Sequence, residues 1–344
     1  MTARFPVSDY DLAATLDSGQ VFRWERQGEA WTGVLGGDWF RIAPHAGHLE
    51  IQAATPIPDW DRLRDFLAVD DDLTAICGAF PQEPPMTDAV AACRGLRLLR
   101  QDPWECLASF LLSSTKQIVQ IRQCVDLLCR RFGDPVPVPS GHAPAYRFPA
   151  PERLARAGEA ALRECKLGFR ARYLADTARL VSDEGFDLDS LRVRSSAEAR
   201  EALVSLPGVG RKIADCVLLF AYRRQDAFPV DVWILRALQG LYFPKRRPRQ
   251  RTLMRFVETH FGPFAGYAQQ YLFHHVRTHL GRRAFATPPR DDAVKKGSAR
   301  AVRAGRVESP PFNEQLRAGG PGRGRPGLHA RRVRSPGNPT PGSV

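Results

Sequence analysis

Apolar residues change their spacing once along this chain, and the change separates two kinds of structure. Up to residue 52 they fall on alternate positions, in four runs at Val21–Trp24, Trp31–Val34, Trp39–Ile42 and Leu49–Ile51. A period of two with turns between the runs predicts an antiparallel meander whose aromatic side chains form a sheet core. From about Asp59 the spacing becomes three to four residues, which predicts helices.

The later periodicity and its breaks predict an α+β chain with a mostly helical body. The expected helices are Pro103–Ser114, Gln117–Phe132, Ala171–Ser182, Ser196–Ser205, Arg211–Tyr222, Val232–Leu241, Arg251–Phe261 and Phe264–Leu280. Breaks rich in proline and glycine at 134–151 and 244–250 are expected to be loops. We therefore predict an N-terminal β subdomain at 1–58, a helical domain at 59–285, and a disordered tail rich in Pro, Gly and Arg at 286–344.

Charge and cysteine usage restrict the class of protein. The formal net charge is +13, but residues 290–344 carry twelve Lys and Arg against four Asp and Glu, so +8 of it lies there. Charge alone therefore argues only modestly for nucleic-acid binding by the folded part. The seven cysteines include no Cys-x-x-Cys pair, which disfavours a disulfide framework, a zinc site or an iron–sulfur cluster.

No apolar run approaches the roughly 20 residues that cross a bilayer, and the first residues lack a signal peptide's apolar stretch. We expect an intracellular protein, cytoplasmic and associated with the nucleoid in a bacterium or nuclear in a eukaryote.

The segment Leu206–Cys216 is the most informative motif. Pro207 favours a turn, and Gly208 and Gly210 permit close backbone approach around Val209 before a helix begins near Arg211. Amides exposed at such a hairpin can bind a DNA phosphate without regard to sequence. An ordinary helix–turn–helix linker would explain this pattern equally well, so the motif needs support from other residues.

That support comes from the residues that follow the hairpin. Lys212 lies in the first turn of the predicted helix, and Cys216 lies one turn later on the same face. Asp231, in the run Phe228–Trp233, occupies the N-cap position of the next helix. Together these residues resemble the helix–hairpin–helix DNA glycosylase superfamily, and most closely its 8-oxoguanine glycosylase/lyase branch. The resemblance extends through most of residues 10–280 and includes Arg100–Pro103 with Ser113 and Ser114.

The resemblance implies that Lys212 and Asp231 are catalytic. Cleavage of an N-glycosidic bond builds positive charge on the deoxyribose, which a carboxylate such as Asp231 can stabilise. A neutral lysine amine can attack C1′ and form a Schiff base, after which β-elimination breaks the strand. Taken singly, an early helical lysine is usually solvated and an aspartate before a helix is usually only a cap. No cofactor or metal is needed for this chemistry.

The resemblance also implies which residues recognise the base. Ser18–Trp24 is similar to the family's N-terminal signature, in which Gly19 offers its carbonyl to the lesion. Guanine N7 only accepts hydrogen bonds, whereas oxidation at C8 converts it to a donor, so this carbonyl would attract the lesion and repel normal guanine. In Gly262–Phe273, Gln269 would bind the base edge and Phe273 would stack on its face, with Cys216 against the other face. By pattern alone, Phe273 would be a core residue.

Other matched positions would contact the DNA. Leu167–Tyr173 resembles the loop that fills the vacated stack, with Phe169 as wedge and Arg170 reaching the orphaned base. Thr115 and Gln120 stand where animal members carry an asparagine and an arginine that read the opposite cytosine, and Trp233 replaces a histidine near the backbone contact. We therefore expect the enzyme to discriminate less between C and A opposite the lesion than animal relatives do.

The expected partner is damaged double-stranded DNA, bound by a monomer, with room for a structural cation at the hairpin carbonyls. Two alternatives remain open. A monofunctional glycosylase for alkylated purines would use Asp231 to activate water and would not need Lys212. A nonenzymatic DNA-binding protein would use only the hairpin and would leave Asp231, Gln269 and Phe273 without a role.

Overall fold

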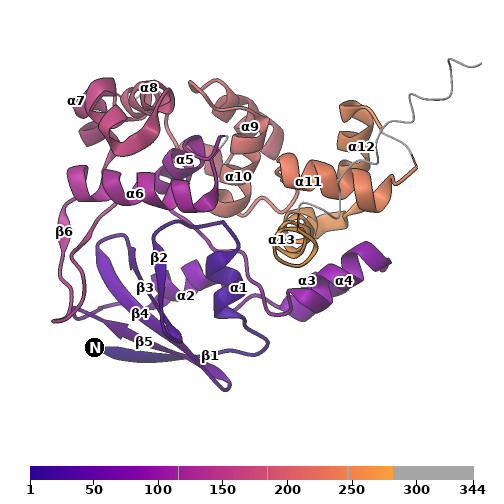
Figure 1. The fold of residues 1–344 in the computed structure, drawn as a ribbon, viewed down its shortest axis with the longest axis horizontal. Helices are drawn as coiled ribbons and strands as arrows, with labels where there is room; N and C mark the ends of the chain where they lie inside the picture. Colours follow the sequence, from indigo (N-terminus) through magenta and orange to yellow (C-terminus); the bar gives the residue numbers. More distant parts are fainter. Residues whose placement is uncertain (115, 184, 246–247, 282–344) are drawn as a thin grey trace, which may run out of the picture. The chain divides into compact units, whose positions relative to one another are not determined.

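The computed structural model describes residues 1–114, 116–183, 185–245 and 248–281, all within one unit, Met1–Pro288 (Figure 1). Thr115 and the predicted tail at 286–344 lie outside the described residues. No helix among the described residues is long and apolar enough to span a bilayer.

Within the described residues, the predicted meander is part of a five-stranded antiparallel sheet with strand order β1-β5-β4-β3-β2. Its strands are β1 (Thr2–Pro6), β2 (Trp24–Gln27), β3 (Ala30–Leu35), β4 (Asp38–His45) and β5 (His48–Ala53). Trp31 pairs with Ile42, and Ile42 pairs with Ile51 on the next strand, so side chains of one parity share a buried face. The sheet prediction is therefore confirmed, with the edge strand β1 added.

The first predicted strand was placed too early. The chain enters β2 only at Trp24 because the preceding residues are held by the helical body. The Phe22 ring packs edge-on against Phe110 at 5.6 Å, and Arg23 forms an ion pair with Glu105 at 3.0 Å. Phe22 therefore belongs to the helical core and not to the sheet.

The remaining described residues are mostly helical, as predicted. The α-helices are α1 (Leu12–Asp17), α2 (Asp61–Leu67), α3 (Leu73–Gly78), α4 (Pro84–Ala92), α5 (Pro103–Leu111), α6 (Ile118–Phe132), α7 (Pro151–Leu162), α8 (Arg170–Ser182), α9 (Ser196–Val204), α10 (Arg211–Tyr222), α11 (Val232–Ala237), α12 (Gln250–His260) and α13 (Ala265–His275). Short π-helical turns are η1 (Arg163–Leu167), η3 (Leu238–Tyr242) and η5 (Val276–Leu280), 3-10 turns are η2 (Asp189–Arg192) and η4 (Gly262–Phe264), and a small ribbon pairs β6 (Pro135–Val136) with β7 (Ala145–Tyr146).

The predicted bounds of α10 are confirmed without change, and those of α6, α8, α9 and α12 agree to within one residue. Some helices were not predicted from the spacing of apolar residues, and the structure shows why. α1 and α3 each contain six residues, too few for an apolar period to repeat, and α7 is interrupted at Gly158, whose φ is +70°.

Two hydrophobic cores place the elements around the site. One lies between the sheet and helices α1 and α2, where Trp24 stacks on Phe66 at 5.6 Å. The other fills the helical body around α5, whose Phe110 stacks on Phe220 of α10 at 5.5 Å. The pairing of α5 with α10 brings the end of α5 beside the start of α10 (Figure 1).

Candidate active site

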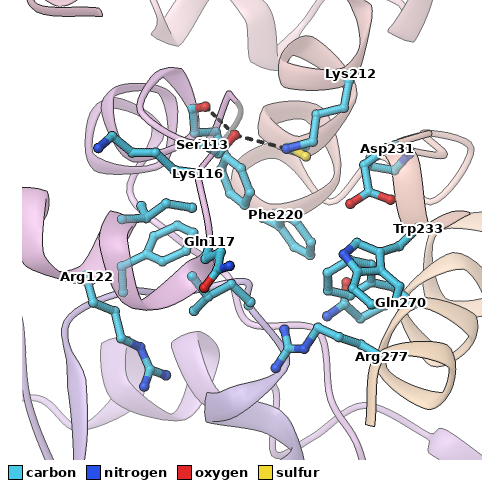
Figure 2. A pocket seen from close by; sticks show the side chains of 18 of the residues that line it. Ser113, Lys116, Gln117, Arg122, Lys212, Phe220, Asp231, Trp233, Gln270 and Arg277 are labelled. Atoms are coloured by element: carbon cyan, nitrogen blue, oxygen red, sulfur yellow. Dashed lines mark hydrogen bonds between the residues drawn. The ribbon is translucent and has the colours of Figure 1, made fainter. Parts of the chain in front are cut away.

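A cavity of about 660 Å³ opens where α10, α11 and α13 meet the loop after α1 and the end of α5 (Figure 2). It gathers side chains from segments that are far apart in the sequence. The six residues predicted for catalysis and base recognition all line it: Gly19, Lys212, Cys216, Asp231, Gln269 and Phe273.

Lys212 projects into this cavity from the second position of α10. Its Nζ donates a hydrogen bond to Ser113 Oγ at 3.0 Å and lies 5.1 Å from the centre of the Phe110 ring. Ser113 in turn donates to the Phe110 carbonyl at 2.6 Å, which fixes the orientation of its hydroxyl. The amine is thus held half-buried in the cavity by the residues that follow α5, as Figure 2 shows.

Asp231 lies in the same cavity at the start of α11. The predicted N-cap is confirmed, because its Oδ1 accepts a hydrogen bond from the Ile234 amide at 2.8 Å. Burial raises the pKa of the Asp231 carboxyl above its ordinary value, and the Ile234 amide and the Lys212 charge oppose that rise. The helix cap therefore fixes a carboxylate close enough to Lys212 for the two charges to interact.

Gly19 is held rigidly with an uncommitted carbonyl group. The Ser18 carbonyl before it accepts from Gln270 Nε2 at 3.0 Å, and the Gln20 carbonyl after it accepts from Gln101 Nε2 at 2.8 Å. Among the described residues, no donor contacts the Gly19 carbonyl. This leaves one acceptor without a partner at a residue that lines the cavity.

Gln269 supplies a second unpaired polar group. It is only 4% exposed, and its Oε1 has no hydrogen-bond partner among the described residues. An unpaired buried amide costs about 1–3 kcal/mol, a cost that a bound ligand would remove. Nearby, burial raises the pKa of the Cys216 thiol to about 11, so Cys216 presents a neutral, weakly polar wall at neutral pH.

Arg277 is a cavity residue that the sequence analysis missed. Its guanidinium donates to the Asp17 carbonyl at 2.8 Å and lies 5.5 Å from the centre of the Phe273 ring. Gln269, Phe273 and Arg277 recur every four residues, so helical spacing could have identified the third member of this set. Trp233 and Gln270 also line the cavity.

The hairpin before α10 has the predicted form. Gly208 is exposed with φ +77°, and a side chain there would meet the Tyr173 ring at 2.6 Å. Gly210 is the N-cap of α10, and Val209 is buried beneath the turn. The Pro207 carbonyl accepts from the Thr177 hydroxyl at 3.2 Å, which ties the turn to α8.

The predicted wedge loop presents one side chain and retains the other. Phe169 is 54% exposed at the start of α8, whereas Arg170 is 5% exposed and donates to the Ser114 carbonyl. The Arg170 guanidinium stacks on the Phe169 ring at 4.3 Å. Contact between Arg170 and an orphaned base would therefore require it to leave the Ser114 carbonyl.

Gln120, predicted to read the opposite base, is exposed on α6. Its Oε1 accepts from the Gln117 amide at 3.0 Å and closes a capping box. It lies along an open groove of about 950 Å³ that shares Ser113, Lys212 and Asp231 with the cavity.

Comparisons with known proteins agree with this arrangement. Residues 3–107 match the family model of the 8-oxoguanine DNA glycosylase N-terminal domain, and residues 108–263 match the HhH-GPD superfamily of base excision DNA repair proteins. These two matches define the class of the fold as a helix–hairpin–helix DNA glycosylase.

Individual relatives narrow the class further. A probable N-glycosylase/DNA lyase of Methanothermobacter thermautotrophicus is 30% identical over 80% of this chain and 96% of its own. The N-glycosylase/DNA lyase OGG1 of Arabidopsis thaliana is 31% identical over 77% of each chain. The Clostridium acetobutylicum 8-oxoguanine glycosylase/lyase, solved with double-stranded DNA containing cytosine opposite 8-oxoG, superposes with a TM-score of 0.74 at 28% identity, over 80% of this chain and 97% of its own.

The chain therefore belongs to the 8-oxoguanine DNA glycosylase family within the HhH-GPD superfamily. It is a DNA N-glycosylase with DNA lyase activity, and the expected α+β fold with a helix–hairpin–helix body is confirmed.

Proposed function

We propose that this enzyme extrudes 8-oxoguanine, and related oxidised purines, from duplex DNA into the cavity between α10, α11 and α13. The observation that carries the proposal is the Gly19 carbonyl. It has no partner among the described residues, although the carbonyls on both sides of it are hydrogen-bonded, and Gly19 lines the cavity that also holds Lys212. Such an acceptor suits the N7–H donor of the oxidised base and opposes the N7 lone pair of guanine.

In the proposed reaction, Lys212 first loses its ammonium proton to solvent, and the neutral amine then attacks C1′ while the bond from C1′ to N9 of the base breaks. The bonding electrons leave with the base, which takes up a proton as the amine loses one. The Asp231 carboxylate stabilises the positive charge on the sugar as this bond breaks. The sugar ring then opens to a Schiff base, loss of a C2′ proton expels the 3′ phosphate, and water releases the enzyme.

The other cavity residues would hold the extruded base. Gln269 would hydrogen-bond its edge, and this contact would satisfy the buried Oε1 that lacks a partner among the described residues. Phe273 and the neutral Cys216 thiol would cover its faces. The arrangement selects for an oxidised purine because a base without the N7 proton would leave the Gly19 carbonyl unpaired, at about 1–3 kcal/mol.

The DNA backbone and the vacated stack would be held by residues outside the cavity. We propose that the amides around Gly208, Val209 and Gly210 bind a phosphate, with a cation at the remaining hairpin carbonyls, and that Phe169 enters the stack. Arg170 would then swing from Ser114 to the orphaned base. We further propose that the enzyme acts on damaged DNA as a monomer, in the nucleoid of a bacterium or the nucleus of a eukaryote.

The position of Lys212 also separates this proposal from the two alternatives. A monofunctional glycosylase needs no amine in the cavity, and a nonenzymatic DNA-binding protein needs no cavity. Here the amine lines the cavity with Asp231 and is held by Ser113.

Borohydride trapping on a duplex oligonucleotide that contains 8-oxoguanine tests the proposal. Wild type should give a covalent protein–DNA adduct, and Lys212→Gln should give none. Lys116→Gln is the matched control, because Lys116 is the other lysine among the described residues that line the cavity. If the adduct is lost in Lys116→Gln and kept in Lys212→Gln, the nucleophile is Lys116 and the proposal is wrong. If wild type gives no adduct, the result favours a monofunctional enzyme.

A further inference from the structure

A cysteine and two histidines meet outside the active-site cavity. Cys93 caps the C-terminal end of α4, His275 ends α13, and His279 lies one turn later in η5. One potential ligand atom from each, a sulfur and two ring nitrogens, lies within 4.8 Å of the others. Figure 1 shows α4 and α13 next to each other at this end of the protein.

Hydrogen bonds around His279 fix which of its nitrogens is free to bind a ligand. The Thr278 hydroxyl donates its only proton to the His274 carbonyl at 2.7 Å and also lies 2.7 Å from His279 Nδ1. Because that proton is already committed, Nδ1 must be the donor, which leaves the lone pair on Nε2. A hydrogen bond that sets the tautomer in this way is typical of histidines that bind metals.

His275 and Cys93 provide the other two candidate ligands. His275 is 9% exposed, and its Nδ1 has no hydrogen-bond partner among the described residues. The Cys93 sulfur is buried, and its one hydrogen bond among the described residues is a long contact of 3.9 Å to the Tyr271 carbonyl.

We propose that Cys93, His275 and His279 form a zinc site with water as the fourth ligand. A thiolate with two imidazoles is a ligand set that selects zinc over magnesium or calcium. On binding, Cys93 would lose its proton to solvent and form the zinc–sulfur bond. None of the three residues lines the cavity, so the ion would be structural. It would fasten the end of α4 to the helix that carries Gln269 and Phe273.

Cobalt substitution tests this site without reference to DNA repair. Co²⁺ added to untagged, metal-free full-length protein should produce a thiolate-to-cobalt absorption band that saturates at one equivalent and disappears when Zn²⁺ is added. Cys93→Ser should remove the band. His279→Gln should weaken Co²⁺ binding at least tenfold, and because His279 is exposed this variant should still fold.

Matched controls come from residues outside the cluster. Cys77→Ser and His45→Gln replace a half-buried cysteine and an exposed histidine, and both should keep the band. Zn²⁺ should raise the melting temperature of wild type and of both controls, but not of His279→Gln. A wild-type cobalt spectrum without a sulfur band, or one that survives in Cys93→Ser, would overturn the proposal and leave the assignment of Lys212 unaffected.

Discussion

At the scale of single residues, the same groups that suit this site to its chemistry are unfavourable for folding. Asp231 is a half-buried carboxylate, Gln269 has an unpaired Oε1 among the described residues, and Gly19 adopts a positive φ. Each places a polar group where a substrate would satisfy it. Replacing them should therefore separate stability from activity.

Asp231→Asn should strongly reduce excision yet stabilise the fold at neutral pH. Because the folded-state pKa of Asp231 is raised, folding favours its protonated form, so the carboxylate weakens folding once pH exceeds that pKa. Asparagine removes this charge and still caps α11. Excision should fall about 100-fold or more.

Urea unfolding should show the variant more stable than wild type at about pH 7, with the difference shrinking as the pH falls through the raised folded-state pKa of Asp231 toward its ordinary value. A variant that is less stable at both values would mean that Asp231 mainly stabilises the fold.

Gly19→Ala should reduce excision of the lesion more than binding of undamaged DNA. The glycine has φ +82°, a conformation that strains any other residue, and an added Cβ would lie 2.7 Å from Ile118 Cδ1 and 3.1 Å from Arg277 Nη1, so the backbone or these two cavity side chains must move. Gly28→Ala is the matched control, because Gly28 also has a positive φ, +63°, but nothing lies within 4 Å of its added Cβ.

Both variants should lose about 1 kcal/mol of stability through backbone strain. Only Gly19→Ala should slow single-turnover excision. If both variants slow excision equally, the Gly19 carbonyl does not have the proposed role in recognising the lesion.

At the scale of elements, the hairpin depends on a buried charge between its two helices. Asp215 of α10 is 2% exposed, and it pairs with Arg200 of α9 at 2.6 Å and with Arg211 at 3.6 Å. Burial raises the pKa of Asp215, and the hydrogen bond from Arg200 opposes the rise. This interaction fixes the angle between the helices that flank the turn.

Arg200→Ala should lower the free energy of unfolding by about 2–3 kcal/mol, because it leaves a buried carboxylate with one weaker partner. Urea denaturation measures this loss. Arg192→Ala is the control, since Arg192 pairs at 3.1 Å with an exposed aspartate, Asp189, and should change stability by less than about 1 kcal/mol. If the two variants lose similar free energies of unfolding, the Asp215 pair contributes no more to stability than an exposed ion pair does.

At the scale of the whole molecule, DNA would have to contact several surfaces at once. The hairpin, the exposed Phe169 and the groove that includes Gln120 come from different elements. Most of the net charge of +13 lies in residues 290–344. Recognition of the lesion and of its partner base must therefore depend on individual side chains of the folded part and not on its overall charge. The residues facing the opposite base should therefore decide how strongly the enzyme discriminates between C and A opposite the lesion.

We expect the excision rates for lesions opposite C and opposite A to differ less than they do in animal relatives. The reason is that Gln120 carries a neutral amide, whose Oε1 is engaged in a helix cap, where animal relatives carry a charged arginine. Single-turnover assays on the two paired oligonucleotides measure the ratio. Gln120→Arg should raise the preference for C, and a strong preference for C already present in wild type would contradict the expectation.

The sequence by itself determined the local structure and the identity of the reactive groups. Helix α10, the cap at Asp231 and the Gly208 turn depend on contacts between residues a few positions apart, so spacing and residue type were sufficient to predict them. The resemblance to a known family supplied Gly19, Gln269 and Phe273, which no local pattern would have singled out.

Only the tertiary structure decided how distant segments meet. In the structure, Arg170 points inward and donates to the Ser114 carbonyl, and Phe22 packs in the helical core and not in the sheet. Cys93 lies next to His275 and His279. These outcomes depend on how whole helices pack, because side chains far apart in sequence are brought together only when the surrounding core closes. The cavity that unites Lys212 with Gly19 has the same origin.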